Sequence, residues 1–403
     1  MMIRLSYVVS LWLSAFLTVS AVAQECLEDD YRLTIDAKIN GQPVCLIVDT
    51  GSRGALLFRT AANHLKLKTE PATGETKPLL DEIQAEVSEP FDFEFGGKVS
   101  KGATCVVADC TRSMPGVHGV LGWAELRGRI TELDWGNSSV TFCDTLPTKV
   151  LNWSKITLAD DTPTAIIDIN RGERSKGMLF LDTGSEFGID LNATNWTQWK
   201  SDHADMPKAL SAAWYFGGLS VCEETWAHQI VLSPFTFDEI PVKESPAFFA
   251  STPDFEACIG VYALSCFHIV IDGPQNTMYF CHNNSARKRY RYNRLGAVFV
   301  PKNKDENALL VARVLPTSPA FRSGIRDGDE LTQIENLDAT KWRSDSKLMP
   351  LGQFFERSAG TKIDLSVLRN GAVLRFSVAL EELLPGATTS TGAQKRDTHN
   401  KCK

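Results

Sequence analysis

The 403-residue sequence lacks the marks of several large protein classes. After residue 24 it has no run of 18 apolar residues, the length that a membrane-spanning helix needs. Basic residues are outnumbered, with 42 Lys and Arg against 49 Asp and Glu, and this balance argues against nucleic acid as a partner. The ordinary globular composition, with 43% hydrophobic and 23% charged residues, excludes wholesale disorder and a coiled coil.

Motifs for several kinds of catalysis are also missing. The seven histidines form no HExxH sequence and no close Cys/His cluster, so we expect no metal site. The chain has no G-x-S-x-G nucleophile elbow and no glycine-rich phosphate loop. We therefore expect neither a serine hydrolase nor a bound cofactor.

The N-terminus predicts export. Residues 1–24 contain a single charge, at Arg4, and the apolar stretch from Leu5 ends in Ala21-Val22-Ala23, which fits a signal-peptide cleavage site. We interpret residues 1–23 as a signal peptide, with an N-terminal membrane anchor as the alternative. The mature chain would then be periplasmic or extracellular, in an oxidising compartment where cysteines form disulfides.

The cysteines are distributed unevenly along the chain. Nine of the ten lie between Cys26 and Cys281, whereas residues 282–401 have none, which suggests a domain boundary near residue 290. Cys105 and Cys110 are close enough in sequence to close a short loop, but the full connectivity is not derivable. The Gly/Thr/Ser-rich residues 386–403 predict a disordered tail.

The cysteine-containing region is an internal repeat. Asp-Thr-Gly-Ser occurs at residues 49–52 and again at 182–185. Downstream of each copy, a Gly (Gly122 or Gly260) is followed by an Asp 12 residues later and a Cys 21 residues later. Two copies with matched spacing indicate duplicated lobes, which we place at residues 24–148 and 149–290.

Both lobes are predicted to be mainly β. Apolar residues alternate from Leu33 to Ile39, Asn40-Gly41 marks a hairpin, and the apolar run 44–48 leads into Asp49. A second alternation, a turn at 170–172 and an apolar run lead likewise into Asp182. Each Asp-Thr-Gly therefore follows a buried strand. Residues 292–385 predict a small β-rich domain with two short helices.

Two such loops predict acid–base chemistry. A pseudo-twofold axis would bring them face to face, and two adjacent carboxylates share one proton. The ionised carboxylate can deprotonate a water while the protonated one donates to the attacked carbonyl. Gly51 and Gly184 would permit close backbone approach, and the Thr and Ser hydroxyls would orient the carboxyls.

Residues 28–285 resemble the aspartic peptidases through the doubled Asp-Thr-Gly-Ser and the segments 119–122 and 258–260, with lobes of retropepsin-like length. The resemblance implies a mainly β, pseudo-twofold acid-protease fold whose catalytic pair is Asp49 and Asp182. Thr50 and Thr183 would lock the loops together, and Ser52 and Ser185 would bond the outer carboxylate oxygens. A flap tyrosine is not found, and residues 77–95 are the candidate flap.

Residues 291–385 resemble a bacterial-type PDZ domain through residues 311–314, 318–320, 323–325, 327–329 and 367–371. The resemblance implies a small α+β fold that binds extended peptides beside a helix at 350–357. Its carboxylate-binding loop would be Arg294-Leu295-Gly296.

The sequence thus predicts an exported, monomeric aspartic endopeptidase that acts on protein or peptide substrates. One alternative is a catalytically inactive peptide-binding scaffold that relies on the PDZ groove. Another is a homodimer in which each lobe pairs with its copy in a second chain.

Overall fold

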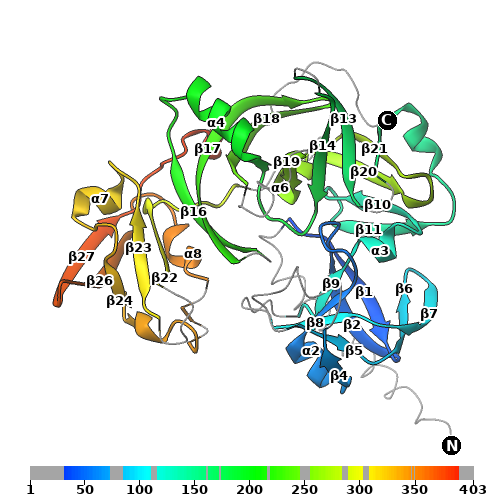
Figure 1. Ribbon diagram of the computed structural model, residues 1–403, viewed down its shortest axis with the longest axis horizontal. Coiled ribbons are helices and arrows are strands. Elements are labelled where there is room, and N and C mark those ends of the chain that lie inside the picture. Colours follow the sequence, from blue (N-terminus) through cyan, green and yellow to red (C-terminus); the bar gives the residue numbers. More distant parts are fainter. Residues whose placement is uncertain are drawn as a thin grey trace, which may run out of the picture.

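The computed structural model describes residues 31–72, 85–109, 116–159, 162–171, 174–215, 218–245, 255–283, 289–302, 308–345, 347–348 and 350–389. The predicted signal peptide, part of the candidate flap (77–84) and residues 390–403 lie outside these ranges. Among the described residues, no helix has the length and apolar character required to cross a bilayer. Most elements are strands, as predicted (Figure 1).

The first lobe is built on a nine-stranded sheet in the order β4-β5-β8-β3-β9-β2-β1-β6-β7. The predicted hairpin at Asn40 and Gly41 joins β1 to β2, with φ of 49° and 79° at the two turn residues. Side chains of β1 alternate between buried and exposed, as the sequence predicts. The strands and helices are β1 (Thr34–Ile39), β2 (Gln42–Val48), β3 (Leu56–Phe58), α2 (Arg59–His64), β4 (Thr69–Pro71), β5 (Ala85–Ser88), β6 (Phe91–Phe95), β7 (Lys98–Ala103), β8 (Val106–Ala108), β9 (Gly119–Leu121) and α3 (Trp123–Leu126).

The second lobe repeats the central part of this arrangement in a seven-stranded sheet, β13-β14-β19-β15-β18-β17-β16. In the first lobe β2 runs parallel to β9, and in the second β14 runs parallel to β19. Its elements are β13 (Thr164–Arg171), β14 (Arg174–Asp182), β15 (Ile189–Leu191), α4 (Ala193–Asp202), β16 (Ala209–Tyr215), β17 (Gly218–Leu232), β18 (Phe235–Glu244), β19 (Phe255–Gly260) and α6 (Val261–Leu264).

A third sheet is shared by the two lobes. Its order is β11-β10-β20-β21-β12, and strand β10 of the first lobe pairs antiparallel with β20 of the second. One hydrophobic core runs through both lobes. The elements are β10 (Ile130–Asp134), β11 (Ser139–Cys143), η2 (Thr148–Asn152), β12 (Ser154–Thr157), β20 (Phe267–Asp272), η3 (Gly273–Gln275) and β21 (Thr277–His282).

The C-terminal domain has its own sheet, β22-β23-β24-β26-β27, and its own core. It contacts the second lobe through an apolar patch in which Leu210 and Leu219 pack on Val298, Val300 and Val311. Figure 1 shows β16 beside β22 at this junction. The elements are β22 (Ala297–Pro301), β23 (Leu310–Val314), α7 (Pro319–Ser323), β24 (Glu330–Ile334), β25 (Leu337–Asp338), η4 (Ala339–Lys341), α8 (Gly352–Phe355), β26 (Lys362–Arg369) and β27 (Ala372–Ala379).

Two details differ from the sequence-based expectations. Residues Gly386–Thr389, placed in the predicted disordered tail, form helix α9 with Ala387 fully buried against the second lobe. Cys105 has a free thiol, 3.6 Å from the Ser88 hydroxyl, so it does not close a loop with Cys110. Free thiols among the described residues include Cys45, Cys143, Cys222 and Cys258.

Candidate active site

Both Asp-Thr-Gly-Ser loops stand at the ends of buried strands, where the sequence predicts them. β2 ends at Val48 and β14 ends at Asp182. The segment that follows β9 or β19 fixes each loop, because Trp123 donates its backbone N–H to Ser52 O and Val261 donates to Ser185 O, both at 2.7 Å. The repeated sequence thus produces a repeated backbone hydrogen bond.

The two loops interlock through their threonines. Thr50 N–H donates to Thr183 Oγ1 at 3.0 Å, and Thr183 N–H donates to Thr50 Oγ1 at 3.1 Å. Each hydroxyl then donates across to the other lobe, from Thr50 to Leu181 O at 2.6 Å and from Thr183 to Val48 O at 2.7 Å. Both threonines are buried, so the reciprocal bonds fix one loop against the other.

The carboxyl groups of Asp49 and Asp182 lie face to face and hydrogen-bond each other. A Cβ added at Gly51 would overlap the Asp182 carboxyl, and one added at Gly184 would overlap that of Asp49. Only glycine leaves room for this cross-packing at the two positions.

Backbone amides hold both carboxyls. Asp182 Oδ1 accepts from Gly184 N at 2.9 Å and from Ser185 N at 3.1 Å, and Asp49 Oδ1 accepts from Ser52 N at 3.1 Å. The Ser52 hydroxyl does not make the bond to the outer oxygen that the resemblance implies. It donates to Gly54 O at 2.8 Å instead.

Burial and neighbouring groups change the pKa values of both carboxyls. Burial raises the pKa of Asp182 well above its usual range, and the neighbouring Asp49 charge raises it further. Burial also raises the pKa of Asp49, but the Ser52 and Gly51 amides, the Asp182 hydrogen bond and the Arg32 cation oppose the rise. The two carboxyls therefore bind protons as a coupled pair, which holds its first proton more tightly than an isolated aspartate would.

Arg32 connects the first lobe to the second loop. Its guanidinium lies 2.7 Å from the Glu186 carboxylate, and only 10% of the Arg32 side chain is exposed. Sequence analysis did not pair these two residues. Residues 32 and 186 are too far apart in sequence for local patterns to reveal the pair.

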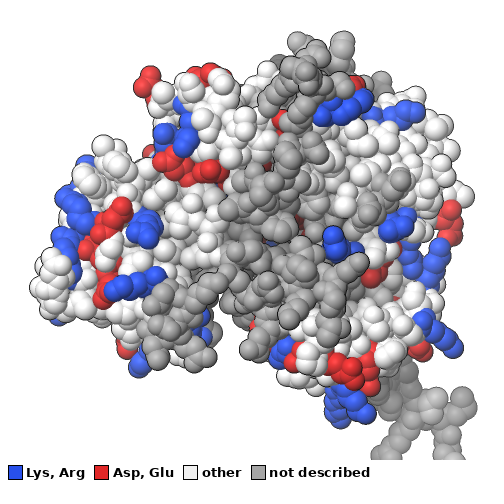
Figure 2. Space-filling model, viewed as in Figure 1, with Lys and Arg blue, Asp and Glu red and all other residues white. Residues whose placement is uncertain are grey.

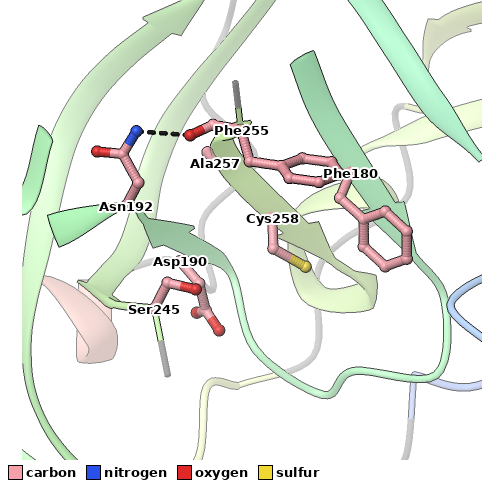
Figure 3. A pocket seen from close by; sticks show the side chains of 7 residues that line it. All are labelled: Phe180, Asp190, Asn192, Ser245, Phe255, Ala257 and Cys258. Carbon is pink, nitrogen blue, oxygen red and sulfur yellow. Dashed lines mark hydrogen bonds between the residues drawn. The ribbon is translucent and has the colours of Figure 1, made fainter. Parts of the chain in front are cut away.

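Behind the second loop lies a cluster of buried charges that the sequence analysis missed. Asp190, Lys243 and Glu224 are all at most 3% exposed, and Lys243 Nζ lies 3.6 Å from Asp190 Oδ2. Burial raises the pKa of Asp190 to about 6 and that of Glu224 to about 7. Figure 3 shows Asp190 near Ser245 and Cys258, and burial raises the pKa of the Cys258 thiol well above its usual value.

The PDZ loop residues are placed at the start of edge strand β22, but Arg294 faces inward. It is 1% exposed, donates to Glu356 O at 2.8 Å and pairs with Glu382 at 3.3 Å. Leu295 lies in the domain core, and Gly296 has a φ of +70° against Ser318. Because Glu382 already neutralises it, the Arg294 cation holds the domain together and does not face a ligand.

One group of side chains has a composition that metal ions favour. Glu132 and Asp134 on β10 and His268 on β20 place their ligand atoms within 4.8 Å of one another. His268 Nε2 lies 2.6 Å from Glu132 Oε1, and Lys149 Nζ lies 2.5 Å from the same oxygen. With Lys149 bonded to Glu132, the group forms an ion-pair network between the lobes.

Charged side chains on the face shown in Figure 2 are of both signs and intermixed, including those over the PDZ domain. Such a mixed surface provides no large field of a single sign.

Comparisons with known proteins agree with the motifs. Residues 35–124 match the family described as aspartyl protease, and residues 293–380 match the PDZ domain family. A solved structure with local similarity is the EIAV protease complexed with the inhibitor HBY-793, with 22% identity over 24% of this chain and 86% of that chain and a TM-score of 0.19. No curated protein matches the sequence significantly. The chain therefore combines a first lobe of the aspartyl protease type with a C-terminal PDZ domain.

Proposed function

We propose that this protein is an aspartic endopeptidase whose Asp49/Asp182 pair activates a water molecule. The interlocked loops carry the proposal, because they bring together two buried carboxyls whose pKa values are both raised. Asp49 would accept a proton from the water, and Asp182 would donate one to the carbonyl of the scissile amide. No covalent intermediate forms in this scheme.

Each part of the site has a task in this mechanism. The amides of Ser52, Gly184 and Ser185 orient the carboxyls, and the threonine interlock sets their separation. Both loops come from one chain, so a second copy is not needed to complete the pair, which favours a monomeric enzyme over the homodimer.

Substitution of either aspartate tests the proposal. Asp49→Asn and Asp182→Asn should each lower kcat for cleavage of an unfolded protein by roughly 10²–10⁴-fold, the range for loss of a general acid or base. Asp168→Asn, a substitution at an exposed aspartate of the second lobe, is the matched control and should keep full activity. Undiminished cleavage in a folded Asp49 or Asp182 variant would disprove the mechanism.

The pH profile is a second test. Cleavage requires a singly protonated pair, so the rate should fall when the second proton binds at low pH and again when the pair loses its remaining proton at higher pH. The two apparent pKa values belong to the pair. Pepstatin should block the activity. If the wild-type chain binds peptides but cleaves none across this range, the inactive-scaffold alternative is supported instead.

We further propose that the mature chain acts after export, in the periplasm or outside the cell. The apolar N-terminal residues 1–23 support this location. N-terminal sequencing of the purified protein from its native source tests it. A chain that begins at residue 24 agrees with the proposal. A chain that retains residue 1 and fractionates with the cytoplasm contradicts it, and one that retains residue 1 in the membrane fraction supports the membrane-anchor alternative.

We also propose that the PDZ domain binds extended peptide segments. The position of β22 at the end of the described sheet order supports this, since PDZ domains accept peptides by strand addition. Because the Arg294 cation is already paired with Glu382, Arg294 is not expected to contribute to ligand affinity.

A further inference from the structure

After the PDZ domain the chain returns to the second lobe. Leu384 and Ala387 are fully buried in the core that the two lobes share, and helix α9 packs on β17 and β18. A Cβ added at Gly386 would overlap the indole ring of Trp226, so the backbone of this segment lies directly on that ring. We call residues 383–387 the C-terminal strap.

The linker that enters the PDZ domain meets the strap at the same place. Tyr290 donates its hydroxyl hydrogen to Glu224 Oε2 at 2.9 Å, and its ring centroid lies 5.9 Å from that of Trp226. The hydroxyl oxygen of Tyr292 accepts from Leu384 N at 3.1 Å. The linker and the strap therefore both pack against strand β17.

The linker also contacts Tyr262 directly, whereas the strap reaches it through Trp226. Tyr262 follows the segment that supports the second catalytic loop. Its ring centroid lies 4.9 Å from that of Tyr290 and 6.5 Å from that of Trp226. Its backbone N–H donates to Phe187 O at 3.2 Å, next to the Val261 bond to Ser185 O at 2.7 Å. A displacement of Tyr262 would therefore act on the backbone hydrogen bonds that hold residues 185–187.

The first lobe has no equivalent of this side-chain support. In the repeat, Gly122 corresponds to Gly260, so Ala124 corresponds to Tyr262. Ala124 makes a similar backbone bond, to Arg53 O at 2.9 Å, one position earlier in the loop than the Phe187 acceptor, but its methyl group is exposed. The aromatic contacts are thus not required by the repeated fold itself.

We propose that the PDZ linker and the C-terminal strap form a clamp that positions the second active-site loop through Tyr262. Tyr262 and Tyr290 are positioning residues in this scheme, and the segments on both sides of the PDZ domain form part of the peptidase. The proposal rests on the proposed peptidase function for its kinetic consequence, but its structural consequence is independent of that function.

The sharpest test inserts one methyl group between the strap and Trp226. Gly386→Ala should lower kcat roughly 10- to 100-fold, the cost of a small misplacement of catalytic groups, with KM unchanged. Its matched control is Gly128→Ala in the first lobe, where an added Cβ meets no atom within 4 Å. The control should retain wild-type kcat.

Two substitutions of Tyr262 distinguish a positioning effect from a loss of folded protein. Tyr262→Ala should lower kcat and shift the pH profile, whereas Tyr262→Phe keeps the ring and should restore both. Ala124→Ser, at the equivalent exposed site, should change neither. A thermal melt establishes that each variant is folded at the assay temperature.

Amide hydrogen exchange of residues 183–189 supplies a readout that needs no catalysis. Faster exchange in Gly386→Ala than in Gly128→Ala supports the clamp even if the wild-type chain cleaves nothing, an outcome that would refute only the peptidase proposal. Unchanged exchange in a folded Gly386→Ala variant overturns the clamp, as does a kcat loss that only follows the loss of folded protein.

Discussion

The two lobes share one loop design but differ in what surrounds it. Trp123 and Val261 make the same backbone bond to the serine of each motif, and the threonines exchange identical hydrogen bonds. Around the second loop stand a buried charge cluster and the aromatic clamp, whereas the first lobe has an exposed Ala124 at the position equivalent to Tyr262. A repeated motif thus specifies geometry, and its surroundings give each half a different task.

The first part of the comparison, the loop geometry that the lobes share, is tested most strongly at the threonine interlock. Thr50→Val and Thr183→Val each remove two buried hydrogen bonds, so each should lower the free energy of unfolding by roughly 2–6 kcal/mol. Because the bonds are reciprocal, the two costs should be alike and the double variant strongly non-additive. Urea denaturation measures this.

Thr197→Val, at an exposed helical position, is the control and should cost well under 1 kcal/mol. Unequal costs at Thr50 and Thr183, differing by more than about 2 kcal/mol, would show that the lobes do not share the interlock evenly.

The buried charge cluster of Asp190, Glu224 and Lys243 tests the second part of the comparison, the surroundings in which the two lobes differ. The folded-state pKa of Glu224 is raised to about 7, so this group stabilises the fold fully below its unfolded pKa and less as the pH rises through 7. The loss between about pH 4.5 and 7.5 amounts to about 3 kcal/mol. Glu224→Gln should abolish that part of the pH dependence of unfolding.

Asp190, with its pKa raised to about 6, contributes in the same direction and should leave a residual slope in the variant. Glu223→Gln, a neighbour on the exposed side of the same strand, is the matched control and should follow the wild-type curve. Identical curves for Glu224→Gln and the wild type would contradict the raised pKa.

The smallest expected effect concerns the patch between the second lobe and the PDZ domain. Leu210→Ala should lower the free energy of unfolding by about 2 kcal/mol, at the low end for a buried leucine because the patch is small. It should also speed amide exchange in β22. Val221→Ala, at a position 38% exposed on the same hairpin, should do neither.

Sequence reasoning succeeded where short segments determine structure. The hairpin at Asn40-Gly41 needs positive φ at two residues, and the alternation in β1 follows from one buried face. The facing loops of Asp49 and Asp182 followed from the repeat, because a duplicated fold places equivalent loops around one axis.

Sequence reasoning did not predict features that depend on residues far apart in the chain. Asp190, Glu224 and Lys243 are individually unremarkable acidic and basic residues, and only the strand order of the second sheet brings them together. Composition suggested a disordered tail at residue 386, yet a glycine there is what lets the strap lie on Trp226. Tertiary packing overrides such local preferences.

The sheet shared by the lobes has a consequence for synthesis. Residues 130–133 pair with residues 269–272, so β10 leaves the ribosome long before its partner strand exists. At about 5–20 residues per second the delay is roughly 7–30 s, during which the inner edge of β10 is an open template for other chains. The first lobe therefore cannot complete this sheet before β20 is made.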